Sequence, residues 1–346
     1  MPLRLLLCLA DRVEDKVSSS SIGPETEPLE SAILAALDDL LRALQLEPIG
    51  SDRFRVPADT GRFDRVFGGQ VIAQALLAAG ATVTDKEPHS LHAYFVEAGV
   101  PGEPVEVIVE RVRDGRSIST RRVTVVQGDR PLSTVMVSFH AGHSGRDSAH
   151  LPGLGSESGP PTMAPGEIPR LQDWVRDMSV EMRAYGRTWV EQPPPLELRI
   201  GEPPSFMGGP AAQGTRPHWM RLPRDVGVDP LLHSALLAYA SDFLLLDMVW
   251  RAHPERAVLE PFAGFSLDHA LWFHRPVRFD RWHVHTQEAQ AIAGDRGLVR
   301  GAIHDADGRL VASVMQEVLI RRPAQNATAG TVSTNQASQR PVNNRQ

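Results

Sequence analysis

The sequence predicts an α+β protein made of two tandem units, each an antiparallel sheet wrapped around a helix. Two observations support this fold class. A helix-like run that is apolar on almost every side occurs twice, and each time several strand-like runs follow it. The last strands of the two halves also align without gaps, because Gly115 to Met136 matches Gly294 to Met315 at a constant shift of 179 residues (315 − 136). The repeated order of elements indicates an internal duplication.

The first unit is assigned to residues 29–140. A helix is predicted over Glu30 to Leu46, where apolar residues recur at spacings of three and four. A second helix is predicted over Val71 to Val83, and its nearly uniform apolar surface must be wrapped by other structure. Four strands follow, separated by Pro-Gly, Asp-Gly and Gly-Asp turn signals. They are predicted at Leu91–Val96, Val105–Val112, Ser117–Gln127 and Leu132–His140.

The second unit is assigned to residues 221–322, after a linker with local structure at 141–220 that is dense in Gly, Pro and Ser. Asp229 and Pro230 form a helix cap and first turn, and the helix is predicted to continue to about Trp250. Four strands are again predicted after the helix. They lie at Ser266–Phe273, His283–Ala293, Leu298–His304 and Leu310–Ile320.

The two ends of the chain, residues 1–28 and 323–346, are predicted to be disordered or extended. The apolar run after Arg4 has about six residues, which is shorter than the roughly 7 to 15 of an export signal. A net charge of −6 leaves no basic surplus for nucleic acid. No run approaches the ~18 uninterrupted apolar residues of a membrane span. Since Cys8 is the only cysteine, no disulfide framework is expected, and a cytoplasmic location fits best.

Several common catalytic motifs are absent from the sequence. It contains no G-x-S-x-G, G-x-G-x-x-G, G-x-x-x-x-G-K-[ST] or H-E-x-x-H motif. Serine hydrolase, nucleotide-binding and zinc protease functions therefore lose their main support. His283 and His285 would share one strand face, but we interpret that face as exposed rather than as a metal site. No metal and no other cofactor is expected.

Two polar residues interrupt apolar surroundings. Asp242 lies within the apolar run Leu231 to Leu246, where an ionised carboxylate is costly unless it is hydrogen-bonded. Gln316 stands in an apolar row of its strand, and its counterpart at the shift of 179 residues is Val137. This asymmetry favours a site in the second unit only. The alternatives for Asp242 are a structural cap or a carboxylate pointing outward at a helix kink. The alternative for Gln316 is a buried amide bonded to the backbone.

Gly68, Gly69 and Gln70 begin the first apolar helix. Their backbone N–H groups at the positive end of the helix dipole could hold an oxyanion or a carbonyl oxygen. Close packing of the helix, which glycine permits, explains the same residues equally well. His89 and His92 are interpreted as histidines of the core or of a sheet edge.

Six motifs in one order resemble the acyl-CoA thioesterase II (TesB-type) family, over about Leu37 to Arg321. These motifs are Phe67–Gln70, His89–Phe95, Arg113–Ser117, Tyr239–Asp242, Leu267–Pro276 and Ala312–Glu317. The resemblance implies a double hotdog fold, which agrees with the duplication. It also implies a homo-oligomer that hydrolyses fatty acyl-CoA to fatty acid and CoA, without metal or covalent cofactor.

The resemblance also implies the residues that act. The catalytic Asp of the family falls on Asp242, its Gln on Gln316 and its Thr or Ser on Ser266. Together they would hold and polarise a water that attacks the thioester carbonyl directly. Backbone N–H groups at a helix start would stabilise the oxyanion, with Gly68 and Gly69 as candidates.

Two other classes stay open from the residues alone. A hotdog hydratase or dehydratase would need a well-placed Asp/His pair, and Asp268 and His269 point to opposite faces of a strand. A non-catalytic acyl-CoA sensor would not need Asp242 and Gln316, which argue against it.

Overall fold

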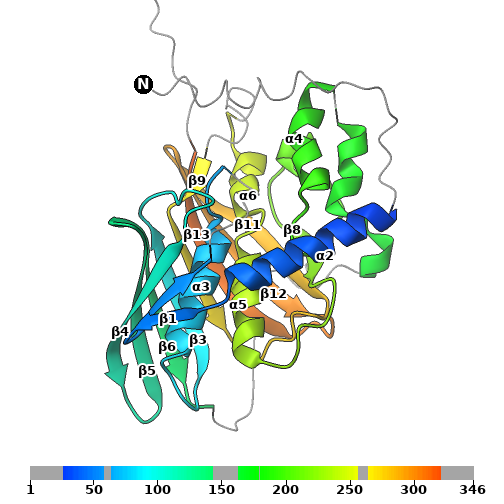
Figure 1. The fold of residues 1–346 in the computed structure, drawn as a ribbon. Helices are drawn as coiled ribbons and strands as arrows, with labels where there is room; N and C mark the ends of the chain where they lie inside the picture. The colour runs from blue at the N-terminus through cyan, green and yellow to red at the C-terminus, as the bar shows by residue number, and fades with distance from the viewer. Residues whose placement is uncertain (1–25, 58–63, 143–162, 179, 256–263, 321–346) are drawn as a thin grey trace, which may run out of the picture.

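The computed structural model describes residues 26–57, 64–142, 163–178, 180–255 and 264–320 (Figure 1). The predicted ends 1–28 and 323–346 therefore lie almost wholly outside the described residues, although helix α2 begins at Thr26. The first half contains α2 (Thr26–Ala43), β1 (Glu47–Gly50), β2 (Arg53–Val56), α3 (Gly68–Gly80), β3 (Glu87–Phe95), β4 (Val105–Asp114), β5 (Ile118–Gln127) and β6 (Arg130–His140).

The second half repeats this order after a connecting region. It contains α4 (Val180–Glu191), β7 (Glu197–Ile200), β8 (Arg216–Arg221), α5 (Pro230–Ser241), α6 (Leu245–Ala252), β9 (Gly264–Ser266), β10 (Asp268–Phe273), β11 (His283–Ala293), β12 (Arg296–Asp305) and β13 (Leu310–Ile320). Short 3-10 helices occur at Pro165–Glu167, Leu171–Asp177 and Ser205–Met207.

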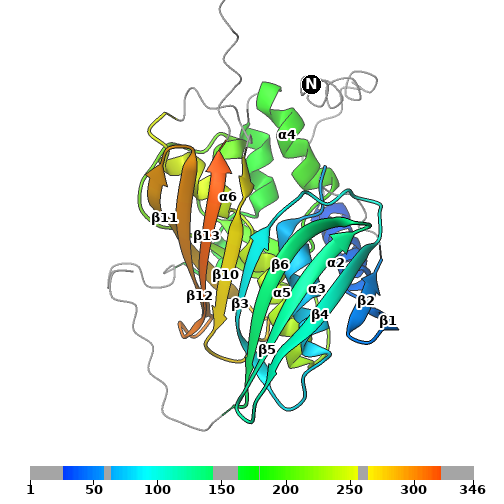
Figure 2. The ribbon, with the colours of Figure 1, turned by 90° about the vertical axis from the view of Figure 1, so that its left-hand side faces the viewer.

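All the strands belong to one continuous antiparallel sheet, in the order β1-β2-β4-β5-β6-β3-β10-β13-β12-β11-β8-β7, with β9 beside β13 (Figure 2). The two predicted tandem sheets join into one, because β3 and β10 pair edge to edge with Leu91 opposite Leu271. On either side of this junction the orders β4-β5-β6-β3 and β11-β12-β13-β10 correspond. The duplication is therefore visible in the topology.

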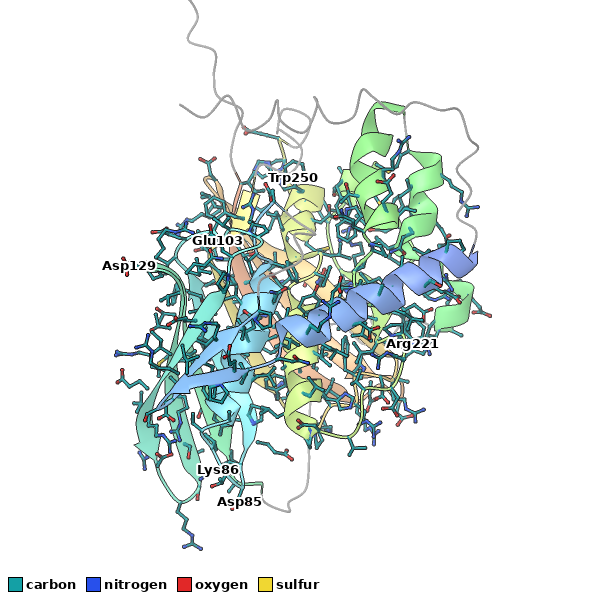
Figure 3. The ribbon with its side chains drawn as sticks, in the orientation of Figure 1. Asp85, Lys86, Glu103, Asp129, Arg221 and Trp250 are labelled. Atoms are coloured by element: carbon teal, nitrogen blue, oxygen red, sulfur yellow. The ribbon has the colours of Figure 1, made fainter. Side chains whose placement is uncertain are left out.

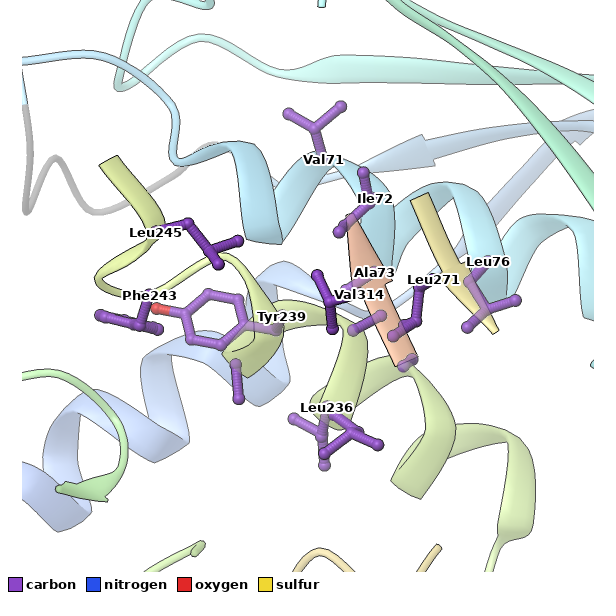
Figure 4. Packing of buried hydrophobic residues seen from close by; sticks show 14 of the residues in the cluster. Val71, Ile72, Ala73, Leu76, Leu236, Tyr239, Phe243, Leu245, Leu271 and Val314 are labelled. Atoms are coloured by element: carbon purple, nitrogen blue, oxygen red, sulfur yellow. The ribbon is translucent and has the colours of Figure 1, made fainter. Parts of the chain in front are cut away.

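Helices α3 and α5 pack against one another on the concave face of the sheet (Figure 1). Their contact is fully buried, with Ile72 and Leu76 from α3, Leu236 from α5, and Leu271 and Val314 from the sheet (Figure 4). Charged side chains such as Asp85 and Asp129 lie instead at the periphery (Figure 3). The apolar sequence of both helices thus forms the centre of the core.

Glycines at both ends of α3 allow the close approach of α5. A Cβ atom on Gly69 would lie 2.3 Å from the carbonyl oxygen of Tyr239, and one on Gly80 would lie 2.4 Å from a methyl group of Leu231. No ordinary packing contact is that short. A larger residue at Gly69 would meet backbone and push the two helices apart, whereas one at Gly80 would require the Leu231 side chain to move.

The helix predicted from Asp229 to Trp250 is broken into α5 and α6. Leu244 adopts a left-handed conformation (φ 67°), and the buried side chain of Gln287 donates a 2.8 Å hydrogen bond to the carbonyl of Phe243. Asp242 consequently follows the last residue of a helix. The segment Pro230–Ala252 is long and apolar enough to span a membrane, but 89% of its most apolar window is buried in the protein, as in a core helix.

The segment predicted as a linker, 141–220, contributes two strands to the sheet. β8 pairs with β11 and β7 pairs with β8, and β8 crosses the predicted boundary at residue 220. His283 and His285 of β11, predicted on an exposed face, are buried at 2% and 0% exposure. The second unit therefore extends further toward the N-terminus than predicted, and β8 covers the edge of β11, with His218 next to His285.

Candidate active site

Asp242 occupies the point where the C-terminal end of α5 meets the N-terminal end of α3. Its side chain is buried, and its Oδ2 atom accepts a hydrogen bond from the backbone N–H of Gly69 (2.9 Å). A Cβ atom on Gly68 would lie 2.8 Å from the same oxygen, so glycine is needed there. The break after α5 thus points the carboxylate inward, into the positive end of a helix dipole.

Gln316 and Ser266 reach the same carboxylate from the sheet. Gln316 on β13 is 1% exposed, and its Nε2 atom donates a hydrogen bond to the Oγ atom of Ser266 at the end of β9 (2.8 Å). Both side chains also lie close enough to Asp242 to lower the pKa of its carboxyl group. The structure therefore brings together the three side chains that the resemblance selected, although they are far apart in the sequence.

Burial raises the pKa of Asp242 to about 7, and hydrogen bonds from Gln316, Gly69 and Ser266 oppose that rise. Removal from water disfavours the ionised carboxylate, whereas each donor favours it. Near neutral pH the group therefore exists in both protonation states. This is the range in which a carboxylate works well as a general base.

His269 was missed as a site residue by the sequence analysis. It is fully buried on β10, with its Nδ1 atom 2.5 Å from Oε1 of Gln316 and its Nε2 atom 2.9 Å from Oγ of Ser241. Burial lowers the pKa of His269 to about 4, so the ring is neutral. Alternation along the strand, which puts His269 on the same face as Leu271, was the signal that could have found it.

The N–H groups at the start of α3 have different partners. Gly69 donates to Asp242, and Gln70 donates to the carbonyl of Phe67 (3.0 Å). Among the described residues, none accepts a hydrogen bond from the N–H of Gly68. Of the three candidates, only Gly68 therefore keeps an N–H available for an oxyanion.

A cleft of about 330 Å³ adjoins this helix end. It lies between α2, Phe67 and Gln70 at the start of α3, Tyr239 of α5, and the segment 191–195. Gln70 is one of the residues that line the cleft. Phe67 packs on Tyr239, with ring centroids 5.2 Å apart, and both residues line the cleft.

His89 and His92 lie apart from the carboxylate. His89 is half-buried at the edge of β3, where its Nε2 atom is 2.8 Å from the Oγ atom of Ser138. His92 is exposed on the convex face of the sheet and packs edge-on against Trp272. Neither residue is part of the candidate site.

A duplicated helix-wrapped sheet with a carboxylate, an amide and a hydroxyl at the meeting of its two central helices defines a double hotdog protein of the thioesterase class. Sequence models described as "Acyl-CoA thioesterase N-terminal domain" and "Acyl-CoA thioesterase" match residues 56–140 and 195–319. The chain belongs to the acyl-CoA thioesterase family.

Individual relatives support this membership. The chain is 33% identical to acyl-coenzyme A thioesterase 8 of Mus musculus, over 82% of this chain and 88% of that protein. It is 31% identical to acyl-CoA thioesterase 2 of Haemophilus influenzae, over 82% of this chain and 98% of that protein. The crystal structure of the acyl-CoA thioesterase II TesB2 from Mycobacterium marinum is similar, with a TM-score of 0.64 and 32% sequence identity. The match covers 82% of this chain and 99% of that chain. The predicted double hotdog fold is thereby confirmed.

Proposed function

We propose that this thioesterase hydrolyses fatty acyl-CoA by direct attack of a water molecule that Asp242 holds and deprotonates. The observation that carries the proposal is the convergence of Gln316, Ser266 and the N–H of Gly69 on one buried carboxylate. Three donors around one carboxylate fix its orientation and leave it able to accept the proton of a water.

The reaction balances with these groups alone. The water oxygen forms a bond to the thioester carbonyl carbon while one of its protons passes to Asp242. The carbon–sulfur bond then breaks, and the thiolate of CoA takes that proton. The N–H of Gly68, at the start of α3, is placed to stabilise the oxyanion of the intermediate.

The proposal places one active site in each chain. In the first half, Val137 occupies the position that corresponds to Gln316, and it is fully buried in the core. A valine cannot donate a hydrogen bond to a carboxylate or a water. The first half therefore supplies the Gly68–Gly69 end of α3, and the second half supplies the three side chains.

Hydration or dehydration of an acyl thioester is not favoured. Asp268 is half-exposed and accepts a hydrogen bond from the backbone N–H of Glu317 (2.7 Å), whereas His269 points into the core. The two side chains lie on opposite faces of β10, so they cannot act on one substrate as an acid and base pair. The retained Asp242 and Gln316 likewise argue against a non-catalytic sensor.

The expected pH dependence tests the role of Asp242. Because the base must be ionised to accept a proton, kcat/KM should fall as the pH falls through the pKa of about 7. Thiol release from acyl-CoAs of several chain lengths, recorded with a thiol reagent that works in acid, identifies the best substrate for the profile. A kcat/KM that does not change between about pH 5.5 and 8.5 would reject the role of Asp242 as general base.

We also propose a homo-oligomer in the cytoplasm, the location that a single cysteine favours. The oligomer is supported by the convex face of the sheet, where Met136, His92, Ala270 and Met315 lie in one cross-strand row. Tyr94 beside this row is 67% exposed. A row at the centre of a sheet in which three of the four residues are apolar is suited to burial against a second copy.

Light scattering is expected to give a mass that is a multiple of 37.9 kDa. Tyr94→Arg should shift the mass toward that of one chain, because it would bury a charge in the interface. A matched Val228→Arg variant, at a residue that is 77% exposed before α5, should leave the mass unchanged. A wild-type protein with the mass of one chain at micromolar concentration would contradict the proposal.

A further inference from the structure

We propose that His269 is a positioning residue, which fixes the amide of Gln316 so that its NH₂ group faces Asp242 and Ser266. Ser241 supports this role by binding the far side of the imidazole ring. The inference rests on the proposed function, because it concerns the residue that holds Gln316 in its active orientation. His269 itself does not touch the substrate.

The contacts form one buried chain of side chains. Ser241 and His269 are both 0% exposed, and Gln316 is 1% exposed. Ser241 lies 2.9 Å from Nε2 of His269, and Nδ1 of His269 lies 2.5 Å from Oε1 of Gln316. Each link is within hydrogen-bond distance, and no water is needed to complete it.

The amide of Gln316 has two orientations of nearly the same shape. In the observed one, Nε2 donates to Ser266, and the same amide lowers the pKa of the nearby Asp242 carboxyl group, as a donor does. A half-turn would place the amide oxygen against the carboxylate, which repels it, and the site would lose its donor. A partner that can bind only the oxygen or only the nitrogen of the amide therefore decides which orientation Gln316 adopts.

His269 is such a partner when its proton is on Nδ1. A neutral imidazole carries one N–H, so Nδ1–H donates to the oxygen of Gln316 and Nε2 accepts from Ser241. The hydroxyl of Ser241 has a second acceptor, the carbonyl of Ala238 at 2.8 Å. If Ser241 donated there, Nε2 would carry the proton and Gln316 would be turned around. Only the first arrangement gives Asp242 its donor.

A general base role for His269 is not consistent with these contacts. Both ring nitrogens are already engaged by protein side chains, and the ring is fully buried. Its effect on the reaction must therefore pass through Gln316. This dependence is what a double substitution can measure.

His269→Leu is expected to lower kcat about 10- to 100-fold with KM changed less than about twofold, because misplaced groups lose transition-state contacts. In a Gln316→Leu background, His269→Leu should cause almost no further loss, since the residue it positions is gone. His269→Asn, whose amide can donate near the place of Nδ1, should restore part of kcat. His274→Leu is the matched control, because His274 is an exposed histidine bonded to Ser313 after the same strand, and it should keep full activity.

Additive losses in the double variant, or full activity of folded His269→Leu, would overturn the inference. A direct measurement does not depend on any variant: the ¹⁵N shifts of His269 in the wild-type protein should show the proton on Nδ1 at about pH 8, well above the ordinary histidine pKa. A proton on Nε2 would overturn the inference as well. A wild-type protein without thioesterase activity would reject the proposed function, whereas the ¹⁵N result would stand by itself.

Discussion

Replacing Asp242 by Asn is expected to lower kcat about 10²- to 10³-fold while the fold stays intact. Asn keeps the shape of the side chain and an oxygen that can accept the hydrogen bond from Gly69, but it cannot take a proton from water. Thiol release at about pH 8, where the wild-type carboxylate is mostly ionised, measures the loss. Asp129→Asn in an exposed turn is the control, and near-normal turnover by a folded Asp242→Asn would contradict the role.

The same variant should be more stable than the wild type at high pH. The pKa of Asp242 in the folded protein, about 7, is above its ordinary value of 3.8, so the folded state binds the proton more tightly than the unfolded state. Wild-type stability therefore decreases as the pH rises from about 4 to 7, and Asp242→Asn removes that decrease. Urea unfolding at about pH 5 and 8 should show a difference between the two proteins that grows with pH.

Replacing Gly69 by Ala is expected to destabilise the protein by about 3 kcal/mol or more. The new methyl group would lie 2.3 Å from the backbone oxygen of Tyr239 and 2.5 Å from the ring of Phe67. The ring can turn, but the backbone oxygen belongs to the central helix α5 and can move only with it. Displacing α5 would also move Asp242, so activity should fall together with stability.

Urea unfolding monitored by circular dichroism measures this change, with Gly166→Ala as the control. A Cβ atom on Gly166 would meet no atom within 4 Å, so the same substitution there should change stability little. If the two variants had the same urea midpoint of unfolding, the prediction that the close contact between α3 and α5 excludes a larger residue at Gly69 would be contradicted.

Local patterns in the sequence predicted most of the elements. The strands His283–Ala293 and Leu310–Ile320 have the predicted bounds, because alternation of side chains and Gly-containing turns define them locally. The single polar residue in an apolar row also identified Gln316, which the structure places beside Asp242. A polar residue at a position that the sequence pattern predicts to be buried is therefore the local signal for this site.

Long-range pairing explains what the sequence did not predict. The edge-to-edge junction of Leu91 with Leu271 depends on two strands that are far apart in the chain. The break at Leu244 lies inside an unbroken apolar run, and a tertiary hydrogen bond from Gln287 accompanies it. His269 was passed over because its neighbour in sequence was considered as its partner, whereas its partners in space are Gln316 and Ser241.

The fusion of two sheets at the β3–β10 junction has a consequence for how copies of the protein can associate. In the part of the chain that the structure describes, the main strand path ends on two strands of only four residues, β1 and β7. Pro48 in β1 has no N–H to offer, and charged residues alternate with apolar ones in β7. Such short, interrupted edges are poor templates for strand addition, which protects the protein against edge-to-edge aggregation. The homo-oligomer proposed above would then form through the faces of the sheet.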